Sequence, residues 1–260
     1  MGPLVTLTTD FGTKDPYVAA IKGVFYSLIP EVRLVDITHE LPAFEPMMAL
    51  PFLVDTLPCF PADSFHLIVI DPGVGSNRKA VAIRGAFGWA VLPDNGLPSL
   101  IRQWMGPLSC YEIQTTPSQK GFHSPTFQAR DLFAPVLAEI ALGTNPEQLG
   151  EKIDPETLSP IEHPLPDGHL RIWNIDRFGN ILLGYKSEVS PTSVNIFLNN
   201  KEIPFVRRYQ NIGIGETGVL INSSGWLEIF SREGSAASIL NLSRGQLLPV
   251  HIQGGKGRVF

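Results

Sequence analysis

Three acidic residues in the N-terminal half of the chain each stand directly after an apolar, strand-like run: Asp10, Asp71 and Asp94. Ligands of an open α/β sheet bind at the carboxyl ends of its strands, so these carboxylates are candidates for catalysis or binding. An aspartate in such a place also commonly caps a turn, and each of the three taken alone has that simpler interpretation. Their recurrence at strand ends favours one shared site.

A glycine-rich loop begins at Asp71 and ends at Arg78, with the sequence Asp-Pro-Gly-Val-Gly-Ser-Asn-Arg. Its glycines would let the backbone approach a ligand closely, between an acid and a guanidinium. It is not a phosphate-binding P-loop, because the Gly-Lys-Ser/Thr ending and the helix after it are missing. The aspartates could hold a hard cation, but no His-x-x-x-His or Asp-x-Asp cluster supports this weak alternative. We therefore expect no metal.

Two other polar segments could serve the same site or could be structural. Residues 123–131 read His-Ser-Pro-Thr-Phe-Gln-Ala-Arg-Asp, which would also suit the cap of a following helix. Residues 176–180 read Asp-Arg-Phe-Gly-Asn between two strand-like runs and could be a hairpin turn. The same residues offer a nucleoside an aromatic face and polar groups for its ribose diol. Without any comparison, these motifs indicate a small-molecule enzyme of two domains.

The elements that must position these residues alternate in type in the first part of the chain and are all strands in the last. Strands are expected at 4–9, 32–37, 65–70, 80–84 and 89–92, and helices at 17–29, 45–57 and 131–142. This alternation predicts an α/β N-terminal domain with a Rossmann-like layered sheet over residues 1–158. Short strands at 170–175, 180–183, 194–198, 219–221, 226–229 and 247–252 predict a smaller all-β, barrel-like domain over residues 168–260. The aperiodic segment 155–168 is the candidate linker.

Composition excludes several functional classes. The chain has 260 residues, 43% of them apolar, and a net charge of -5, so a nucleic-acid partner is not expected. The N-terminus lacks the features of a signal peptide, and the apolar runs stop short of the roughly 18 residues that span a bilayer. We expect a cytoplasmic protein without a membrane partner. Cys59 and Cys110 are interpreted as buried thiols, and structural or surface roles are favoured for His39 and His66.

The motifs taken together resemble a known family. Their order along nearly the whole chain is similar to that of the S-adenosyl-L-methionine (SAM) hydroxide adenosyltransferases, the SAM hydrolases related to fluorinase and chlorinase. The segments that carry the resemblance are 9–12 (Thr-Asp-Phe-Gly), 35–39 (Val-Asp-Ile-Thr-His), 71–75 (Asp-Pro-Gly-Val-Gly), 93–96 (Pro-Asp-Asn-Gly), 124–127 (Ser-Pro-Thr-Phe), 130–131 (Arg-Asp), 176–180 and 227–229 (Leu-Glu-Ile). Each motif alone is weak, but the combination is specific.

The resemblance implies a hydrolase that releases adenosine and L-methionine from SAM by attack of water or hydroxide at C5′. SAM is then the substrate, no cofactor is needed, and a homotrimer with substrate sites between subunits is implied. A sulfonium is already a good leaving group, so the protein has mainly to align and activate the nucleophile. The substrate-binding residues that the resemblance implies are Asp10, for the ribose hydroxyls, Phe44, near the reacting carbon, and Phe11, Asn95, Phe127, Asp176, Phe178, Asn180, Ser223, Glu228, Ser235 and Ala237.

The nucleophile site separates hydrolases from their halogenating relatives. Where fluorinase-like enzymes carry a tyrosine, this chain has Asp71, and with Arg78 it looks like the water-activating pair of the hydrolases. A carboxylate there would repel a halide but can accept a proton from water. The hydrolases read Thr-Phe-His-Gly, whereas this chain has Gln128 and Ala129 in the last two places. An amide orients water but takes no proton near neutral pH, so a SAM- or adenosine-binding protein without turnover is the alternative; His123 is a conceivable substitute base.

Overall fold

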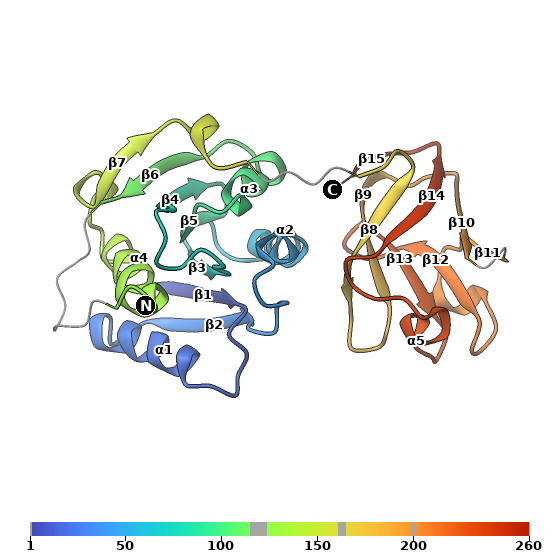
Figure 1. Cartoon of the computed structure of the whole chain (residues 1–260), viewed down its shortest axis with the longest axis horizontal. Coiled ribbons are helices and arrows are strands. Elements are labelled where there is room, and N and C mark those ends of the chain that lie inside the picture. Colours follow the sequence, from blue (N-terminus) through green and yellow to red (C-terminus); the bar gives the residue numbers. More distant parts are fainter. Residues whose placement is uncertain (1, 115–123, 161–164, 199–200, 260) are drawn as a thin grey trace. The chain divides into compact units, whose positions relative to one another are not determined.

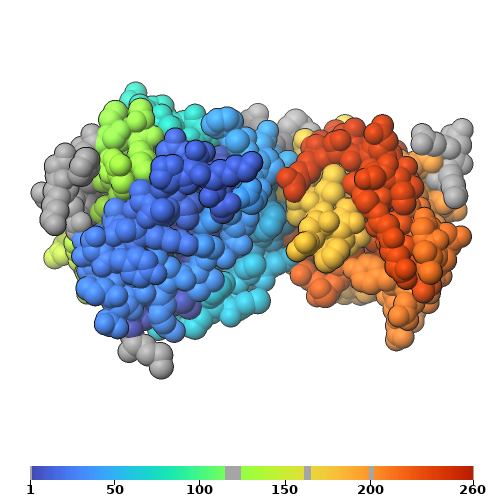
Figure 2. Space-filling model, turned by 90° about the horizontal axis from the view of Figure 1, so that it is seen from below, coloured from blue at the N-terminus to red at the C-terminus, as the bar shows by residue number. Residues whose placement is uncertain are grey.

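The computed structural model describes residues 2–114, 124–160, 165–198 and 201–259. The chain divides into two compact units, residues 1–161 and 162–260, each with its own hydrophobic core (Figure 1). His123 lies outside the described residues. In the space-filling view, the first residues of the chain (blue) gather on one face of the N-terminal unit (Figure 2).

A seven-stranded mixed sheet forms the centre of the N-terminal unit, in the order β2-β1-β3-β5-β4-β6-β7. The first four strands in this order are parallel: β2 (Arg33–Thr38), β1 (Leu4–Thr9), β3 (Phe65–Val69) and β5 (Gly88–Pro93). The other three run antiparallel to their neighbours: β4 (Ala80–Gly85), β6 (Ser109–Ile113) and β7 (Gly150–Ile153). The expected layered α/β unit is thus a mixed sheet with helices, and its Rossmann-like detail stays a prediction.

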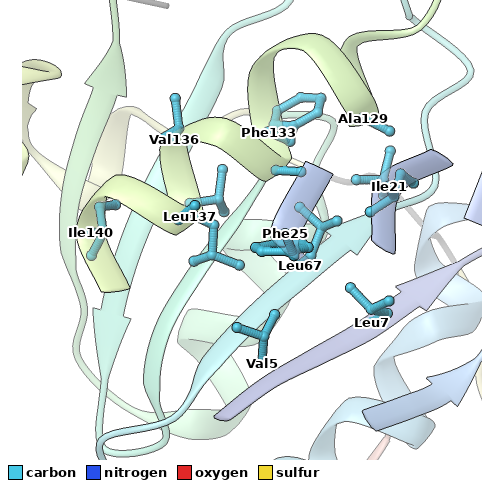
Figure 3. Packing of buried hydrophobic residues seen from close by; sticks show 14 of the residues in the cluster. Val5, Leu7, Ile21, Phe25, Leu67, Ala129, Phe133, Val136, Leu137 and Ile140 are labelled. Carbon is cyan, nitrogen blue, oxygen red and sulfur yellow. The ribbon is translucent and has the colours of Figure 1, made fainter. Parts of the chain in front are cut away.

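In the described part of this unit, four α-helices cover the two faces of the sheet: α1 (Tyr17–Leu28), α2 (Leu50–Thr56), α3 (Leu97–Met105) and α4 (Ala134–Ala141) (Figure 1). The side chains of α1 and α4 meet those of β1 and β3 in one buried cluster, in which Leu7, Phe25 and Phe133 are labelled in Figure 3. Helices α2 and α3 pack together, and α3 contacts β5. Burial of apolar surface contributes about 25 cal/mol per Å² to the stability of these layers. The packed helices thereby hold the strands, and with them the carboxyl edge of the sheet, in place.

The predicted helix over 45–57 is divided in the structure. A 3-10 turn at Pro46–Ala49 precedes α2, and another at Leu57–Cys59 follows it. Proline has no N–H to donate, so Pro46, Pro51 and Pro58 interrupt the regular helical ladder. Cys59 ends the last turn and is exposed, so the expectation that it is buried was wrong, whereas Cys110 is buried in β6.

The first part of the segment expected as a linker packs on the N-terminal unit. Asp94, at the end of β5, accepts hydrogen bonds from the backbone N–H of Ser159 at 3.0 Å and from its hydroxyl at 3.0 Å. Ser99 of α3 donates to the carbonyl of Ser159 at 2.8 Å. Asp94 is 4% exposed, and its oxygens serve this contact. The carboxylate therefore has a structural role and does not join a site shared with Asp10 and Asp71.

His66 in β3 predicts a measurable pH dependence of stability. Its Nδ1 lies 2.8 Å from the hydroxyl of Thr6, and its Nε2 lies 2.9 Å from the carbonyl of Phe87. Burial lowers the pKa of His66 from 6.5 to about 4, although the bond to Phe87 opposes this shift. Between these two pH values the unfolded chain binds the proton more readily, so the free energy of unfolding should fall by up to roughly 3 kcal/mol as the pH drops through the window. Urea unfolding measured at a series of pH values tests this prediction. In the H66N variant, the free energy of unfolding should no longer fall with pH by this amount between pH 6.5 and about 4.

The C-terminal unit is a nearly closed antiparallel barrel. Its sheet has the order β11-β10-β14-β8-β9-β13-β12, with β15 also paired to β9, and β11 approaches β12. The strands are β8 (His169–Ile175), β9 (Ile181–Val189), β10 (Ser193–Leu198), β11 (Lys201–Ile203), β12 (Thr217–Ile221), β13 (Trp226–Ser231), β14 (Leu247–Gln253) and β15 (Lys256–Val259). Within the described part of this unit, the short helix α5 (Ala236–Leu240) and a 3-10 turn at Tyr209–Asn211 interrupt the all-β pattern. None of the helices in the described residues is long and apolar enough to cross a membrane.

Candidate active site

The carboxyl ends of β1 and β3 bring two of the predicted acids together. These strands are parallel and pair Thr9 with Val69, so Asp10 and Asp71 both emerge at the same edge. Burial raises the pKa of Asp10 above its ordinary value; the Phe44 N–H opposes this rise, and the negative charge of Asp71 adds to it. The two carboxylates therefore lie within electrostatic reach of each other.

Arg78 joins Asp71 to Gln128. The Nε of Arg78 donates to both carboxylate oxygens of Asp71, at 3.0 and 3.1 Å, and its Nη2 donates to Oδ2. The same Nη2 donates to Oε1 of Gln128. The three predicted catalytic residues are thus one hydrogen-bonded cluster, with the guanidinium at its centre.

The guanidinium of Arg78 is held in place by its surroundings. Its Cζ lies 5.1 Å from the centroid of the buried Phe133 ring, a cation–π contact. The side chains of Arg78 and Asp71 are only 10% and 4% exposed. A buried bidentate pair fixes geometry much better than an exposed pair does, so the cluster is preorganised.

The glycines of the 71–78 loop permit close packing inside the protein. A Cβ added at Gly75, which has a φ of +80°, would lie 3.2 Å from the Pro125 carbonyl oxygen. A Cβ at Gly73 would lie 3.3 Å from Cγ of Arg78. These glycines therefore let the loop approach the 124–128 segment, which brings Arg78 to Gln128.

A π-helical turn at Ala129–Phe133 positions Gln128 just before α4. Pro135 follows at the start of α4 and has no N–H to donate to the preceding turn, which favours the wider helix at this point. Asp131 holds the entry to the turn, because its Oδ2 accepts from the Ser124 N–H at 2.9 Å. The helical turn has no side-chain cap, because the N-terminal position is Gln128 and Asp131 accepts from the segment before the turn. The capping interpretation of this motif was therefore wrong, and Gln128 joins the cluster.

A small cavity of about 170 Å³ lies beside the cluster, well above the roughly 15 Å³ that one water needs. Asp71 and Gln128 form part of its wall. Phe11, Tyr17 and Phe127 form an aromatic group on another part, with ring centroids 5.3 to 6.3 Å apart. The remaining lining residues are Val69, Val74, Thr126 and Ala129. The cavity thus combines an apolar wall with one polar corner.

Tyr17 is the aromatic residue of the cavity that sequence reasoning missed. It is the first residue of α1, directly after Pro16, and this position directs it to the carboxyl edge of the sheet. The Asp-Pro pair before it is a helix-start signal that locates Tyr17 near the site, but no local pattern shows that its ring meets Phe127.

Phe44 and Asn95 lie at the same edge but outside the cavity wall. The Phe44 N–H donates to Oδ2 of Asp10 at 2.9 Å, the residue has a φ of 67°, and it is 70% exposed. Asn95 donates through Nδ2 to the Ile70 carbonyl at 2.7 Å, so its side chain braces the end of β3. Phe44 leaves a free ring beside Asp10, whereas the amide of Asn95 already has a structural partner.

Five of the C-terminal candidates form one patch of the barrel unit. The 176–180 segment is the hairpin turn between β8 and β9. Its Gly179 carbonyl accepts from the Ala237 N–H at 3.0 Å, and a Cβ at Gly179 would lie 2.1 Å from Oγ of Ser235. Phe178, at the tip of this turn, is 69% exposed. The turn therefore presents an aromatic face beside the start of α5.

Asp176 organises this turn with its own carboxylate. Its Oδ1 accepts from the N–H groups of Phe178 and Asn180 at 2.8 and 2.9 Å. Its Oδ2 accepts from Nδ2 of Asn180 at 3.0 Å. The hairpin interpretation is correct, and the remaining lone pairs of Asp176 are what it could offer to a ligand.

Glu228 is held more deeply than the other candidates. Its carboxylate accepts from the Tyr209 hydroxyl at 2.8 Å and from the Asn222 amide at 3.1 Å. Burial raises the pKa of Glu228, those two hydrogen bonds oppose the rise, and the charge of Asp176 adds to it. Ser223 is exposed between β12 and β13 and has no hydrogen bond to the other candidates within the described residues.

No group of three or more His, Cys, Asp or Glu side chains within the described residues could hold a metal ion. The α/β unit brings one carboxylate, one guanidinium and one amide together beside a small cavity. Such a unit, followed by a barrel that exposes an aromatic turn, defines a two-domain protein that acts on a small molecule.

Comparison with known proteins gives the family. The model of the SAM hydroxide adenosyltransferase N-terminal domain matches residues 5–150, and that of the C-terminal domain matches residues 170–248. The chain belongs to the SAM hydroxide adenosyltransferase family. The resemblance of the motifs is thereby confirmed.

Individual relatives cover nearly the full length. An (R)-S-adenosyl-L-methionine hydrolase from Salinispora tropica is 33% identical over 95% of this chain and 97% of its own length. A fluorinase from Actinopolyspora mzabensis is 26% identical, with the same coverage of both chains. The crystal structure of an uncharacterized conserved protein from Thermotoga maritima matches with a TM-score of 0.83 and 27% identity, over 95% of this chain and all of that one.

Proposed function

We propose that the protein hydrolyses S-adenosyl-L-methionine to adenosine and L-methionine by attack of water at C5′ of the adenosyl group. One observation carries this proposal: Asp71 and Gln128 line the same cavity and Arg78 joins them. Membership of the family and relatives named SAM hydrolases support the substrate.

The reaction needs few groups from the protein. The water oxygen forms a bond to C5′ while the C5′–S bond breaks, and the electron pair of that bond stays on the sulfur of methionine. The released proton passes to the carboxylate of Asp71. Since the sulfonium leaves readily, rate enhancement comes mainly from alignment of water and carbon in a partly dehydrated cavity.

Charge favours a cationic substrate and a neutral nucleophile. Asp10 and Asp71 lie at the same strand-end edge, and their carboxylates attract a sulfonium. The same charges repel a halide, which argues against halogen transfer. A SAM- or adenosine-binding protein without turnover is not favoured either, because Gln128 still completes the cluster around Arg78.

The side-chain amide of Gln128 has a defined orientation in this cluster. Its Oε1 accepts from Arg78, which leaves both amide N–H groups as donors for the cavity. Within the described residues, Nε2 donates to no other protein atom. A water that accepts from this amide can direct one of its own hydrogens to Asp71. Gln128 thereby orients the nucleophile, and Asp71 alone takes the proton.

This division of roles predicts different effects for two substitutions of Gln128. Q128M removes the oriented donor and should lower kcat about 10- to 100-fold. Q128H adds a group that titrates near pH 6.5, so its rate should gain an inflection between about pH 6 and pH 8 that the parent lacks. Initial rates of adenosine release across this range measure both effects. An inflection of equal size in the parent would contradict the assigned roles.

Hydrolysis in ¹⁸O-labelled water tests the function directly. Attack at C5′ should place one ¹⁸O atom in the 5′-hydroxyl of adenosine, with equimolar unlabelled methionine, as mass spectrometry would record. The two configurations at sulfur should be supplied separately, because the relatives' name specifies the (R) form. Release of adenosine no faster than in buffer would overturn the proposal, and a 5′-halo nucleoside would replace it with halogen transfer.

The remaining roles are proposed from the family resemblance. Asp10 would accept hydrogen bonds from the ribose hydroxyls, and Phe44 would lie near the reacting carbon. The exposed turn of the barrel would bind the methionine portion and part of the nucleoside through the residues Asp176, Phe178 and Asn180. A cytoplasmic homotrimer with substrate sites between subunits stays a prediction, and sedimentation equilibrium would measure the number of subunits.

A further inference from the structure

A chain of polar contacts runs through the Val-Asp-Ile-Thr-His motif, to which no role is yet assigned. Nδ1 of His39 lies 2.8 Å from Oγ1 of Thr9, and its Nε2 lies 3.1 Å from Oδ1 of Asp36. Oδ2 of Asp36 accepts from Nζ of Lys22 at 2.6 Å. His39 is 4% exposed and Thr9 fully buried, so the chain leads from the surface of α1 to the end of β1.

The partners of His39 determine which ring nitrogen carries its proton. The Asp36 carboxylate lies 3.1 Å from Nε2 but outside hydrogen-bond geometry. Its negative charge would repel a bare lone pair on Nε2, so it favours the tautomer with the hydrogen on Nε2 and with Nδ1 as the acceptor. The hydroxyl of Thr9 therefore donates to Nδ1. Its oxygen in turn accepts from the Phe11 N–H at 3.3 Å. His39 thus fixes the direction of the Thr9 hydroxyl and, through it, the backbone of the residue that follows Asp10.

The segment that begins at His39 holds the same loop from outside. The His39 carbonyl accepts from the Gly12 N–H at 2.7 Å, and Gly12 has a φ of +66°. Further along, the Phe44 N–H donates to Asp10 at 2.9 Å. The loop after β1 is therefore held at Gly12 and at the Asp10 carboxylate by one neighbouring segment, and at Phe11 through Thr9.

The geometry points to His39 as a positioning residue for nucleoside binding, which acts through Thr9 to hold Asp10 and Phe11 in place. This inference rests on the proposed function, because it assigns the ribose to Asp10. Thr9 is fully buried, so the Asp36–His39–Thr9 series is not a nucleophilic triad. The positioning role requires Nδ1 as an acceptor, while the Asp36 carboxylate holds the other side of the ring in place.

Two substitutions of His39 distinguish the roles of its two ring nitrogens. Asparagine can place an oxygen near the position of Nδ1, whereas glutamine reaches the position of Nε2. H39N should therefore keep the acceptor for Thr9, and H39Q should lose it. The matched controls are H66N and H66Q. His66 makes the same 2.8 Å contact to a threonine of β1, but it lies at the start of β3, away from the carboxyl ends of the strands.

Calorimetric titration with adenosine, together with melting temperatures, tests the inference on the full chain. H39Q should weaken adenosine binding at least tenfold and raise KM for SAM more than it lowers kcat, while H39N should stay within about threefold of the parent. The His66 variants should lose thermal stability and keep their affinity for adenosine. Adenosine binding does not require turnover, so this result is separable from a failure of the parent to hydrolyse SAM.

Three outcomes would overturn the positioning role. Parent-like affinity in both His39 variants would show that the contact to Thr9 does not matter for the ligand. Equal losses of affinity for adenosine in H39N and H39Q would show that an acceptor at the position of Nδ1 is not required. A loss in H66Q as large as that in H39Q would reduce the effect to general destabilisation.

Discussion

The D71N variant should lose nearly all hydrolysis of SAM, with kcat reduced about 10³-fold and KM changed little. Asparagine has nearly the same shape, and its oxygen can still accept from Arg78, but the amide takes no proton near neutral pH. Loss of a positioned general base costs about 10²- to 10⁴-fold in rate. Single-turnover measurement of adenosine release separates this chemical step from binding.

Asp94 supplies the matched control for this experiment. It also follows a parallel strand and is also buried, but its carboxylate accepts from Ser159. D94N should therefore lower thermal stability while kcat stays within about threefold of the parent, since a buried hydrogen-bonded acid contributes about 1–3 kcal/mol. Equal losses of kcat in D71N and D94N would show that Asp71 has no special place in the chemistry.

The sequence allowed the carboxyl edge of the sheet to be predicted, because strand ends follow from local pattern. The expected N-terminal strands agree with β1 to β5 to within one residue at each end, and parallel pairing of β1 and β3 then brings Asp10 near Asp71. Elements with weaker patterns were missed. Helix α3 begins with Leu97-Pro98 and has nine residues, and β6 and β7 are short strands on the antiparallel side.

Contacts between distant residues could not be predicted from local pattern. Gln128 and Arg78 stand 50 positions apart, and their hydrogen bond depends on the packing of Gly75 against Pro125. The same holds for Asp94, whose partner Ser159 is 65 positions away. Identical signals, an aspartate after a buried strand, thus have different outcomes because tertiary partners decide the use of each carboxylate.

The R78M variant should lose both activity and stability. Methionine keeps part of the apolar stem over Phe133 but leaves the carboxylate of Asp71, with a side chain only 4% exposed, without a cationic partner. Breaking a buried pair by removal of one partner costs about 3–5 kcal/mol, because a charge remains without compensation. Urea unfolding should record this loss, and kcat should fall at least 10³-fold since neither Asp71 nor Gln128 keeps its orientation.

The double variant D71N/R78M distinguishes the catalytic from the structural use of this pair. Removal of both charges ends the penalty of the isolated carboxylate, so stability should return to within about 1–2 kcal/mol of the parent. Activity should stay as low as in D71N, because no proton acceptor has been restored. Recovery of stability without activity would assign the guanidinium to both tasks, compensation of a buried charge and alignment of the water. If the double variant instead unfolded as easily as R78M, the lost stability would come from packing around Phe133 and not from the unpaired carboxylate.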